Sequence, residues 1–325
     1  MLNSAQFNPS VVQLHQLAQL DTGYGKQIAF SSDDRTWVST NWGILHLWHD
    51  LTLEHSLRTP GESIDRVLFS TNHDQILASP HKFDVNTRQW HNLPSLAPNL
   101  TAELDTTPSG NFVTTGAVWS ADGTELVVFA EHRASRRPGK TSQWRSPKGR
   151  LLLLNGNTRQ LEQILWQGNG EIYRTIAVSD RAIVAAYTKI QVWDRQTHQL
   201  IATLPGHTAV VRDLRFSPDG KWLASVGADR NIFLWDTTHW TQAATWQAHE
   251  DDIWTVAFHP TLPAIATGAW DNQVKLWTFN GKLLKAETIG SHVEGLAFSA
   301  TGDRLIVATS GSNAKLIVYT LEISP

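Results

Sequence analysis

The hydrophobic residues of this chain fall in short runs separated by turn residues. Within residues 206–236, the runs RDLRF, KWLASV and IFLWD are separated by SPDG and GADRN. Short runs rich in β-branched and aromatic residues, bounded by Gly, Pro, Asp and Asn, predict strands joined by tight turns. THQLIATL, residues 197–204, predicts a further strand that leads into this segment. No long stretch has helical periodicity. The pattern therefore predicts units of four short antiparallel strands.

The unit recurs along the chain. The segment from Ala248 to Trp277 copies residues 206–236, because Phe216 and Phe258 stand 42 residues apart, as do Trp235 and Trp277. Weaker copies occupy residues 23–50, 61–84, 116–154, 170–194 and 289–320. Their seven anchor positions are Phe30, Phe69, Trp119, Val178, Phe216, Phe258 and Phe298. A repeat of about 40 residues with four strands per unit is typical of a β-propeller.

We therefore predict an all-β fold, a single domain over residues 1–325 that forms a seven-bladed β-propeller of four-stranded antiparallel blades. The seventh unit shows only three strands. The N-terminal VVQLHQLAQL, residues 11–20, aligns with THQLIATL. We expect it to join the last blade as the missing outer strand and to close the ring, which removes exposed sheet edges.

Composition excludes several kinds of chemistry. The chain has 325 residues, of which 15 are tryptophan and none is cysteine. The lack of cysteine excludes disulfides, thiol catalysis and cysteine zinc sites. The N-terminus lacks the basic cluster and apolar run of a secretory signal, and no run reaches the roughly 18 apolar residues that span a membrane. A cytoplasmic protein without membrane contact is the expectation.

The Gly-His and Trp-Asp pairs that open and close the clearest unit, repeated in phase, resemble the WD-repeat family. The resemblance covers the whole chain, strongly in units five and six, clearly in four and seven, and weakly in units one to three. It implies a buried hydrogen-bonded tetrad of His, Ser or Thr, Asp and Trp, which satisfies each buried polar group. The matching residues are His207, Ser225, Asp229 and Trp235 in unit five, and His249, Thr267, Asp271 and Trp277 in unit six. The degenerate units lack the tetrad.

Catalysis finds little support in the sequence. His, Ser and Asp within one unit suggest a hydrolase triad, but the same set recurs one repeat later with a tryptophan attached, and no Gly-x-Ser-x-Gly is present. His46 and His49 point to opposite faces of a predicted strand, which disfavours a shared metal. We predict no enzyme activity, cofactor, metal or small-molecule substrate. An enzyme in the central channel stays an alternative, and it would need carboxylates, histidines or a metal contributed by several blades.

Positive charge is concentrated in an insertion of unit three, residues 131–150. The insertion holds seven of the 27 Lys and Arg and one of the 30 Asp and Glu, so the rest of the chain has 20 basic and 29 acidic residues. The candidate binding residues are Arg133, Arg136, Arg137, Lys140, Trp144 and Arg145. Such a loop favours an acidic or phosphorylated protein partner. Nucleic acid bound by the Arg133–Arg150 arm is an alternative, and so is a solvated loop without a specific partner.

The resemblance also implies partner contacts at three positions per blade, on the face that carries the Gly-His loops, called the top. They are the residue four before the anchor, the residue six before it, and the residue before the tetrad Asp. The candidates are Trp254, Asp252 and Trp270 in unit six, Arg212, Val210 and Ala228 in unit five, Arg174 and Ile172 in unit four, Lys26 and Tyr24 in unit one, and Glu294 and His292 in unit seven. Tryptophan and arginine dominate interface hot spots, although Trp254 and Trp270 would alternatively pack between blades. The predicted function is a non-enzymatic scaffold that binds protein partners through its top face and the basic loop.

Overall fold

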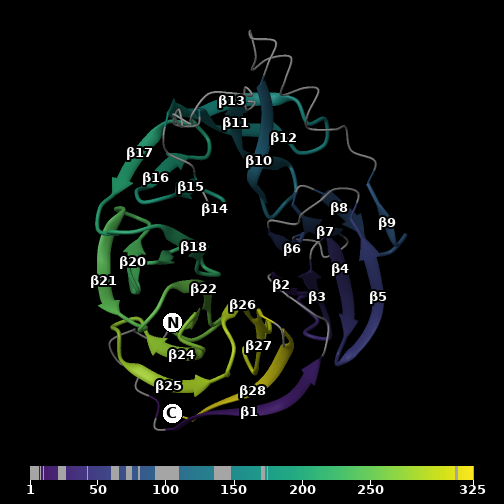
Figure 1. Cartoon of the computed structure of the whole chain (residues 1–325), viewed down its shortest axis with the longest axis vertical. Coiled ribbons are helices and arrows are strands. Elements are labelled where there is room, and N and C mark those ends of the chain that lie inside the picture. Colours follow the sequence, from purple (N-terminus) through teal and green to yellow (C-terminus); the bar gives the residue numbers. More distant parts are fainter. Residues whose placement is uncertain are drawn as a thin grey trace, which may run out of the picture.

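The computed structural model is a ring of β-sheets (Figure 1). It describes residues 7, 9, 11–20, 27–41, 43–59, 66–70, 75–79, 81–91, 110–134, 148–169, 173, 175–311 and 314–324. Within these residues, 28 strands form seven antiparallel sheets of four strands each, and there is no helix. The predicted seven-bladed propeller is confirmed. None of the described residues forms a helix long and apolar enough to cross a membrane.

The first three blades contain the weakly matched units. Blade one consists of β2 (Ile28–Phe30), β3 (Thr36–Asn41), β4 (Ile44–His49) and β5 (Thr52–Arg58). Blade two consists of β6 (Val67–Phe69), β7 (Gln75–Ala78), β8 (His81–Asp84) and β9 (Gln89–Trp90). Blade three consists of β10 (Gly110–Trp119), β11 (Glu125–Ala134), β12 (Lys148–Asn155) and β13 (Leu161–Asn169). The basic insertion therefore joins β11 to β12. Its ends prolong both strands, and residues 135–147 lie outside the described residues.

The remaining blades follow the clearer repeats. Blade four consists of β14 (Thr175–Val178), β15 (Ala182–Ala186), β16 (Ile190–Asp194) and β17 (Leu200–Leu204). Blade five consists of β18 (Val211–Phe216), β19 (Trp222–Gly227), β20 (Asn231–Asp236) and β21 (Thr241–Gln247). Blade six consists of β22 (Ile253–Phe258), β23 (Ala264–Ala269), β24 (Gln273–Thr278) and β25 (Leu283–Thr288). In blades three, five and seven, the turn between the first two strands uses a glycine with positive φ, at Gly123, Gly220 and Gly302.

Blade seven closes the ring with the N-terminal strand. It consists of β26 (Val293–Phe298), β27 (Arg304–Thr309), β28 (Leu316–Ser324) and β1 (Val11–Leu20). β1 pairs antiparallel with β28 from Val11 opposite Ser324 to Leu20 opposite Leu316, so the predicted closing strand is confirmed. A hydrogen bond also joins blade one to blade seven: the Asp34 carboxylate accepts the backbone N–H of Thr301 at 2.8 Å.

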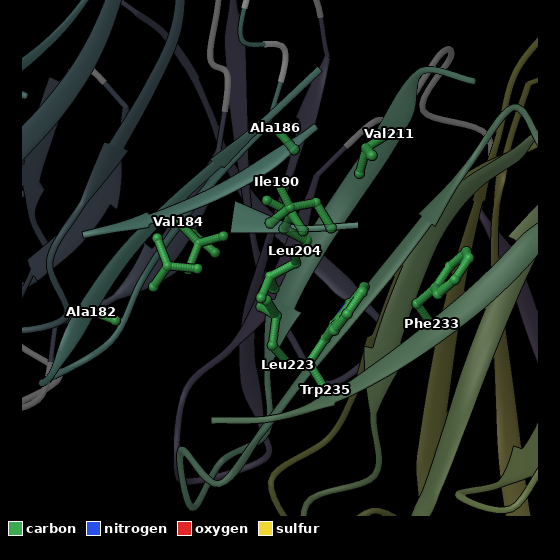
Figure 2. Packing of buried hydrophobic residues seen from close by; sticks show 12 residues of the cluster. Ala182, Val184, Ala186, Ile190, Leu204, Val211, Leu223, Phe233 and Trp235 are labelled. Carbon is green, nitrogen blue, oxygen red and sulfur yellow. The ribbon is translucent and has the colours of Figure 1, made fainter. Parts of the chain in front are cut away.

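The hydrophobic core lies between neighbouring blades. Figure 2 shows the contact of blades four and five, where Val184 and Leu204 face Leu223 and Trp235. The largest fully buried side chains include Trp119 at an anchor position, Trp193 and Trp235 at Trp-Asp positions, and Trp37 of β3. Much of the tryptophan content is therefore core, and the first strands of the blades surround the ring axis (Figure 1).

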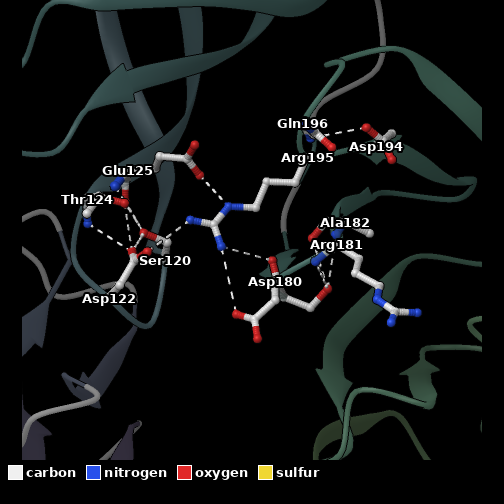
Figure 3. Close-up of polar contacts among 11 residues, drawn as sticks. Ser120, Asp122, Thr124, Glu125, Asp180, Arg181, Ala182, Asp194, Arg195 and Gln196 are labelled. Carbon is white, nitrogen blue, oxygen red and sulfur yellow. Dashed lines mark hydrogen bonds and ion pairs between the residues drawn. The ribbon is translucent and has the colours of Figure 1, made fainter.

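Polar contacts also tie one blade to the next. Figure 3 shows Arg195 of blade four, whose Nε lies 2.6 Å from Glu125 Oε2 and whose Nη2 lies 3.4 Å from Asp122 Oδ2, both in blade three. Burial acts to raise the pKa of Asp122, but hydrogen bonds from Ser120 and Thr124 and the Arg195 charge lower it to about 2. The Asp122 carboxylate therefore stays ionised, and together with Glu125 it holds Arg195 across the boundary.

At two blade boundaries, a side chain of one blade donates a hydrogen bond to the carbonyl oxygen of a turn glycine in the next blade. Lys82 Nζ of blade two donates to Gly123 O of blade three at 2.6 Å. His259 of blade six donates from Nε2 to Gly302 O of blade seven at 3.2 Å. Both glycines belong to the turn between the first two strands, so different side chains fasten equivalent turns.

Candidate interaction surface

The structure brings the four predicted tetrad residues of blade five together. His207 Nδ1 lies 2.7 Å from Asp229 Oδ2, and His207 Nε2 lies 2.8 Å from Ser225 Oγ. The Trp235 indole N–H donates to Ser225 Oγ at 2.9 Å. Because a carboxylate accepts only, Nδ1 of His207 is the donor to Asp229. Every side-chain donor in this chain of bonds has an acceptor.

Blade six repeats this arrangement. His249 Nδ1 lies 2.9 Å from Asp271 Oδ2, His249 Nε2 lies 2.8 Å from Thr267 Oγ1, and Trp277 Nε1 donates to Thr267 Oγ1 at 2.9 Å. Burial acts to raise the pKa of Asp271, but hydrogen bonds from His249 and backbone amides outweigh it and leave the pKa below its ordinary value. Thr267 is 0% exposed, and so is Ser225 of blade five. These buried hydroxyls offer no surface nucleophile.

Blade one keeps part of the same network, which the sequence analysis missed. Trp48 Nε1 donates to Ser39 Oγ at 3.0 Å, and both side chains are buried. The sequence contained a signal for this bond, because a serine precedes the Trp-containing strand in a shortened hairpin. In the structure, Ser39 of β3 pairs with His46 of β4, the strand that carries Trp48. Trp48 also stacks on Trp37, with ring centroids 4.8 Å apart. Blade one thus retains the hydroxyl and the indole of a tetrad.

A β-bulge occupies the same place in the first strand of blades five, six and seven. The register with the second strand shifts between Val211 and Asp213, between Ile253 and Thr255, and between Val293 and Gly295. The bulged residues are Arg212, Trp254 and Glu294. A bulge re-aims a side chain, and these are the residues four before each anchor phenylalanine.

A continuous stack joins these three blades. The Arg212 guanidinium carbon lies 4.4 Å from the Trp254 ring centroid. Trp254 stacks on Trp270 at 4.8 Å with 15° between the ring planes, and Trp270 stacks on His292 at 5.1 Å. Arg212 Nη2 also donates to Asp252 Oδ2 at 2.7 Å. Arginine thus contributes from blade five, both tryptophans from blade six and histidine from blade seven. We call Arg212, Trp254, Trp270 and His292 the stack.

The stack lies at the surface of the molecule. Arg212, Trp254 and Trp270 are partly exposed, and His292 is exposed. The backbone N–H of Trp270 donates to Asp252 O at 3.0 Å, which fixes the base of that side chain. Arg212 Nε and the indole nitrogens of Trp254 and Trp270 have no hydrogen-bond partner among the described residues. The arrangement therefore combines fixed aromatic rings with three unused donors.

Comparison with known proteins agrees with this fold. A family model described as "WD domain, G-beta repeat" matches residues 198–236 and 240–278, which span the end of blade four to most of blade six. The chain is thus a propeller that carries WD repeats in the region of blades five and six. Similar curated proteins are named "Eukaryotic translation initiation factor 3 subunit I". The one from Pyricularia oryzae is 36% identical over 107 residues, which are 33% of this chain and 31% of the relative.

Two further relatives carry the same name. The Coccidioides immitis protein is 34% identical and the Neurospora crassa protein 32% identical, each over 107 residues and 33% of this chain. These matches cover 32% and 31% of the relatives. The matched part therefore spans about a third of their length. The similarity between this chain and these relatives is therefore limited to one segment of 107 residues.

Other predicted contact residues of this WD-repeat propeller are placed only in part. Tyr24, Lys26, Ile172 and Arg174 lie outside the described residues. In the basic insertion, Arg133 belongs to β11 by its backbone, and Arg136, Arg137, Lys140, Trp144 and Arg145 also lie outside the described residues. Val210 and Ala228 are joined by a backbone hydrogen bond of 2.9 Å beside the stack. The stack is thus the part of the predicted surface whose geometry is defined.

Near the axis of the WD-repeat propeller, polar contacts centre on Asp213. This carboxylate lies 2.7 Å from Arg66 Nη2 and 3.2 Å from Arg215 Nε. Across the described part of the chain, no three His, Cys, Asp or Glu residues form a group that would hold a metal ion. Both oxygens of the Asp213 carboxylate are thus engaged in bonds to neighbouring side chains.

Proposed function

We propose that this WD-repeat propeller is a non-enzymatic scaffold whose protein partner docks on the top face of blades five to seven. The observation that carries the proposal is the stack. Aromatic residues and arginine are enriched in interface hot spots. Rings already held by their neighbours lose little rotational freedom on binding, which lowers the entropic cost of association.

The unused donors of the stack support the same proposal. A buried donor without an acceptor costs about 1–3 kcal/mol, and three are found on Arg212, Trp254 and Trp270. Because these nitrogens are buried, a partner's backbone carbonyls would satisfy them only if docking turned the edges of these groups outward. Partly exposed aromatic side chains with donors at their edges suit a polypeptide, which presents many acceptors.

The relatives suggest the setting in which such docking takes place. Their name describes a subunit of a translation initiation factor, so those proteins belong to an assembly. We infer that this chain likewise works as one member of a cytoplasmic multi-protein complex. The basic insertion would add a second contact to an acidic or phosphorylated region of the same partner, since it carries seven Lys and Arg and one Glu. Nucleic acid is the competing occupant of that insertion.

Affinity capture with matched variants tests the stack. Wild type is compared with the triple variant Arg212→Ala, Trp254→Ala, Trp270→Ala in lysate of the source cells. The partner that wild type retains should bind the variant at least about tenfold more weakly, as loss of a hot spot implies. The control variant is Trp222→Ala, Trp240→Ala, Lys221→Ala, which removes two partly exposed tryptophans of blade five outside the stack. Equal capture by both triple variants would exclude the stack as the docking site.

A salt titration tests the basic insertion separately. Deletion of residues 135–147 should weaken partner binding and flatten its dependence on salt, because fewer counterions are released. RNA and DNA are measured in parallel at about 50 mM salt. Retention of nucleic acid that disappears with the deletion would assign the insertion to nucleic acid, and unchanged partner affinity would remove it from the docking surface.

A further inference from the structure

A buried ion pair crosses the ring axis. Arg66 precedes β6 in blade two, and Asp213 lies in β18 of blade five; Figure 1 shows these strands on opposite sides of the axis. Arg66 Nη2 lies 2.7 Å from Asp213 Oδ1, and Arg66 Nη1 donates to Leu214 O at 3.1 Å. Both side chains are almost fully buried. The two-pronged contact fixes the guanidinium relative to both the carboxylate and the backbone of β18.

The same carboxylate binds two further blades. Asp213 Oδ2 accepts the backbone N–H of Val256 in β22 of blade six at 3.2 Å. It also accepts Arg215 Nε at 3.2 Å, and Arg215 Nη2 donates to Gln27 Oε1 of blade one at 3.4 Å. Asp213 thus links β18 to β22 directly and reaches blades one and two through arginines. Burial and the charge of Arg215 lower the pKa of Arg66 to about 10, against the opposing effect of Asp213, so Arg66 is charged at neutral pH.

This network and the stack are formed by neighbouring residues of β18 and β22. Arg212 is the bulged neighbour of Asp213, and Trp254 is the bulged residue two before Val256. The bulge lets Arg212 contact Trp254 at the surface while the next residue, Asp213, bonds across the axis. The bond from Asp213 to Val256 therefore sets how β18 lies beside β22 at the point where Arg212 reaches over to blade six.

We propose that Arg66 is a positioning residue for the top face: with Asp213 it forms a strut across the ring that holds β18 and β22 in the relative placement on which the Arg212–Trp254 contact depends. Without Arg66, the carboxylate loses its two-pronged partner and β18 loses a bond to its backbone. The Val256 bond then weakens and the stack shifts. This inference rests on the proposed function, because it adds Arg66 of blade two to the residues that shape the docking site. Its test measures the geometry of the stack and needs no partner.

Indole N–H resonances of the full-length chain report on the stack. Trp254→Phe and Trp270→Phe assign the two signals in protein labelled with ¹⁵N at tryptophan. Arg66→Met should shift both signals and accelerate their hydrogen exchange. The indoles of Trp235 and Trp277 are bonded to Ser225 and Thr267 and should keep their wild-type signals. Arg181→Met, which removes an exposed arginine of blade four, should leave all four signals in place.

Unchanged Trp254 and Trp270 signals in folded Arg66→Met protein would overturn the proposal. If that variant does not fold, Arg66→Lys decides in the same way: lysine keeps the charge but has a single donor group, so both signals should move, and unmoved signals refute the strut. Failure of the docking proposal looks different. Partner capture that is insensitive to the stack triple variant, together with shifted indole signals in Arg66→Met, would retain the strut and reject the docking site.

Discussion

Blades five and six differ from blade one in how they hold a strand to its loop. In blades five and six, His and Asp complete the bond chain from the indole to the loop that carries the histidine, and Asp229 and Asp271 also accept backbone N–H groups of that loop. Blade one has the Ser39–Trp48 bond, and Trp48 stacks on Trp37. In all three blades a hydroxyl satisfies the indole of the third strand, whereas only blades five and six add the His-Asp bonds that hold the loop.

The boundaries between blades show a second contrast. Between blades two and three, a lysine reaches the turn glycine carbonyl, whereas between blades six and seven the donor is an imidazole. Burial and the charge of Arg159 lower the pKa of Lys82, against the effect of Asp122. The boundary of blades two and three thus uses a long cationic side chain where that of blades six and seven uses an imidazole.

The largest expected effect on stability concerns the Arg66–Asp213 ion pair, which joins the weakly matched blade two to the strongly matched blade five. Arg66→Met should lower the free energy of unfolding by about 3–5 kcal/mol, because it leaves Asp213 buried without its main partner. Arg181→Met, at an exposed site, should change it by less than about 0.5 kcal/mol. Urea denaturation followed by circular dichroism measures both. A loss for Arg66→Met as small as that of the control would mean that the halves are held together without the axis pair.

The blade six to seven boundary should be sensitive to acid. His259 Nδ1 accepts backbone N–H groups of Thr261 and Leu262, and its Nε2 donates to Gly302 O. Burial lowers the pKa of His259 from 6.5 to about 4, against a smaller opposing effect of the Gly302 bond. Between these two values the unfolded chain binds the additional proton, so stability is fully present above pH 6.5 and falls as the pH falls towards 4.

This pH dependence amounts to roughly 3 kcal/mol for His259. His259→Asn should remove that part of the slope between pH 6.5 and 4, whereas His239→Asn, at a side chain that is 74% exposed, should not. Unfolding midpoints in urea across this range measure the slope, to which His249 also contributes because burial lowers its pKa. Parallel profiles for His259→Asn and wild type would contradict the assignment of a neutral His259.

The tetrads should account for the next largest effect. Asp229→Ala or Asp271→Ala should destabilise the protein by roughly 1–3 kcal/mol, since each leaves a buried histidine N–H and a loop N–H without an acceptor. Asp219→Ala, which is exposed in a turn of blade five, is the matched control. Thermal melting of the three variants checks the expectation. Wild-type melting temperatures for both tetrad variants would show that the bonds add nothing to stability.

The sequence predicted what repeats and missed what does not. The period placed the closing strand at residues 11–20, where β1 lies, because each unit carries the same alternation and turn residues. Trp254, Asp252 and Arg212 were selected by their offset from the anchor, and they are in contact. Arg66 lies within the second unit, but the repeat pattern does not indicate its partner, so its bond to a residue 147 positions away left no signal. Contacts between blades on opposite sides of the ring can be identified only once the folded structure is known.

The smallest effect separates the two versions of the tetrad. Ser39→Ala should cost about 1 kcal/mol, because it leaves the buried Trp48 N–H without its acceptor while the stacking on Trp37 persists. Ser225→Ala breaks bonds to both Trp235 and His207, and it should therefore cost about twice as much. Both serines are at most 1% exposed, so burial is matched, and urea denaturation of the two variants gives the ratio. Equal losses would mean that the imidazole of blade five adds nothing beyond the serine–indole bond that blade one already has.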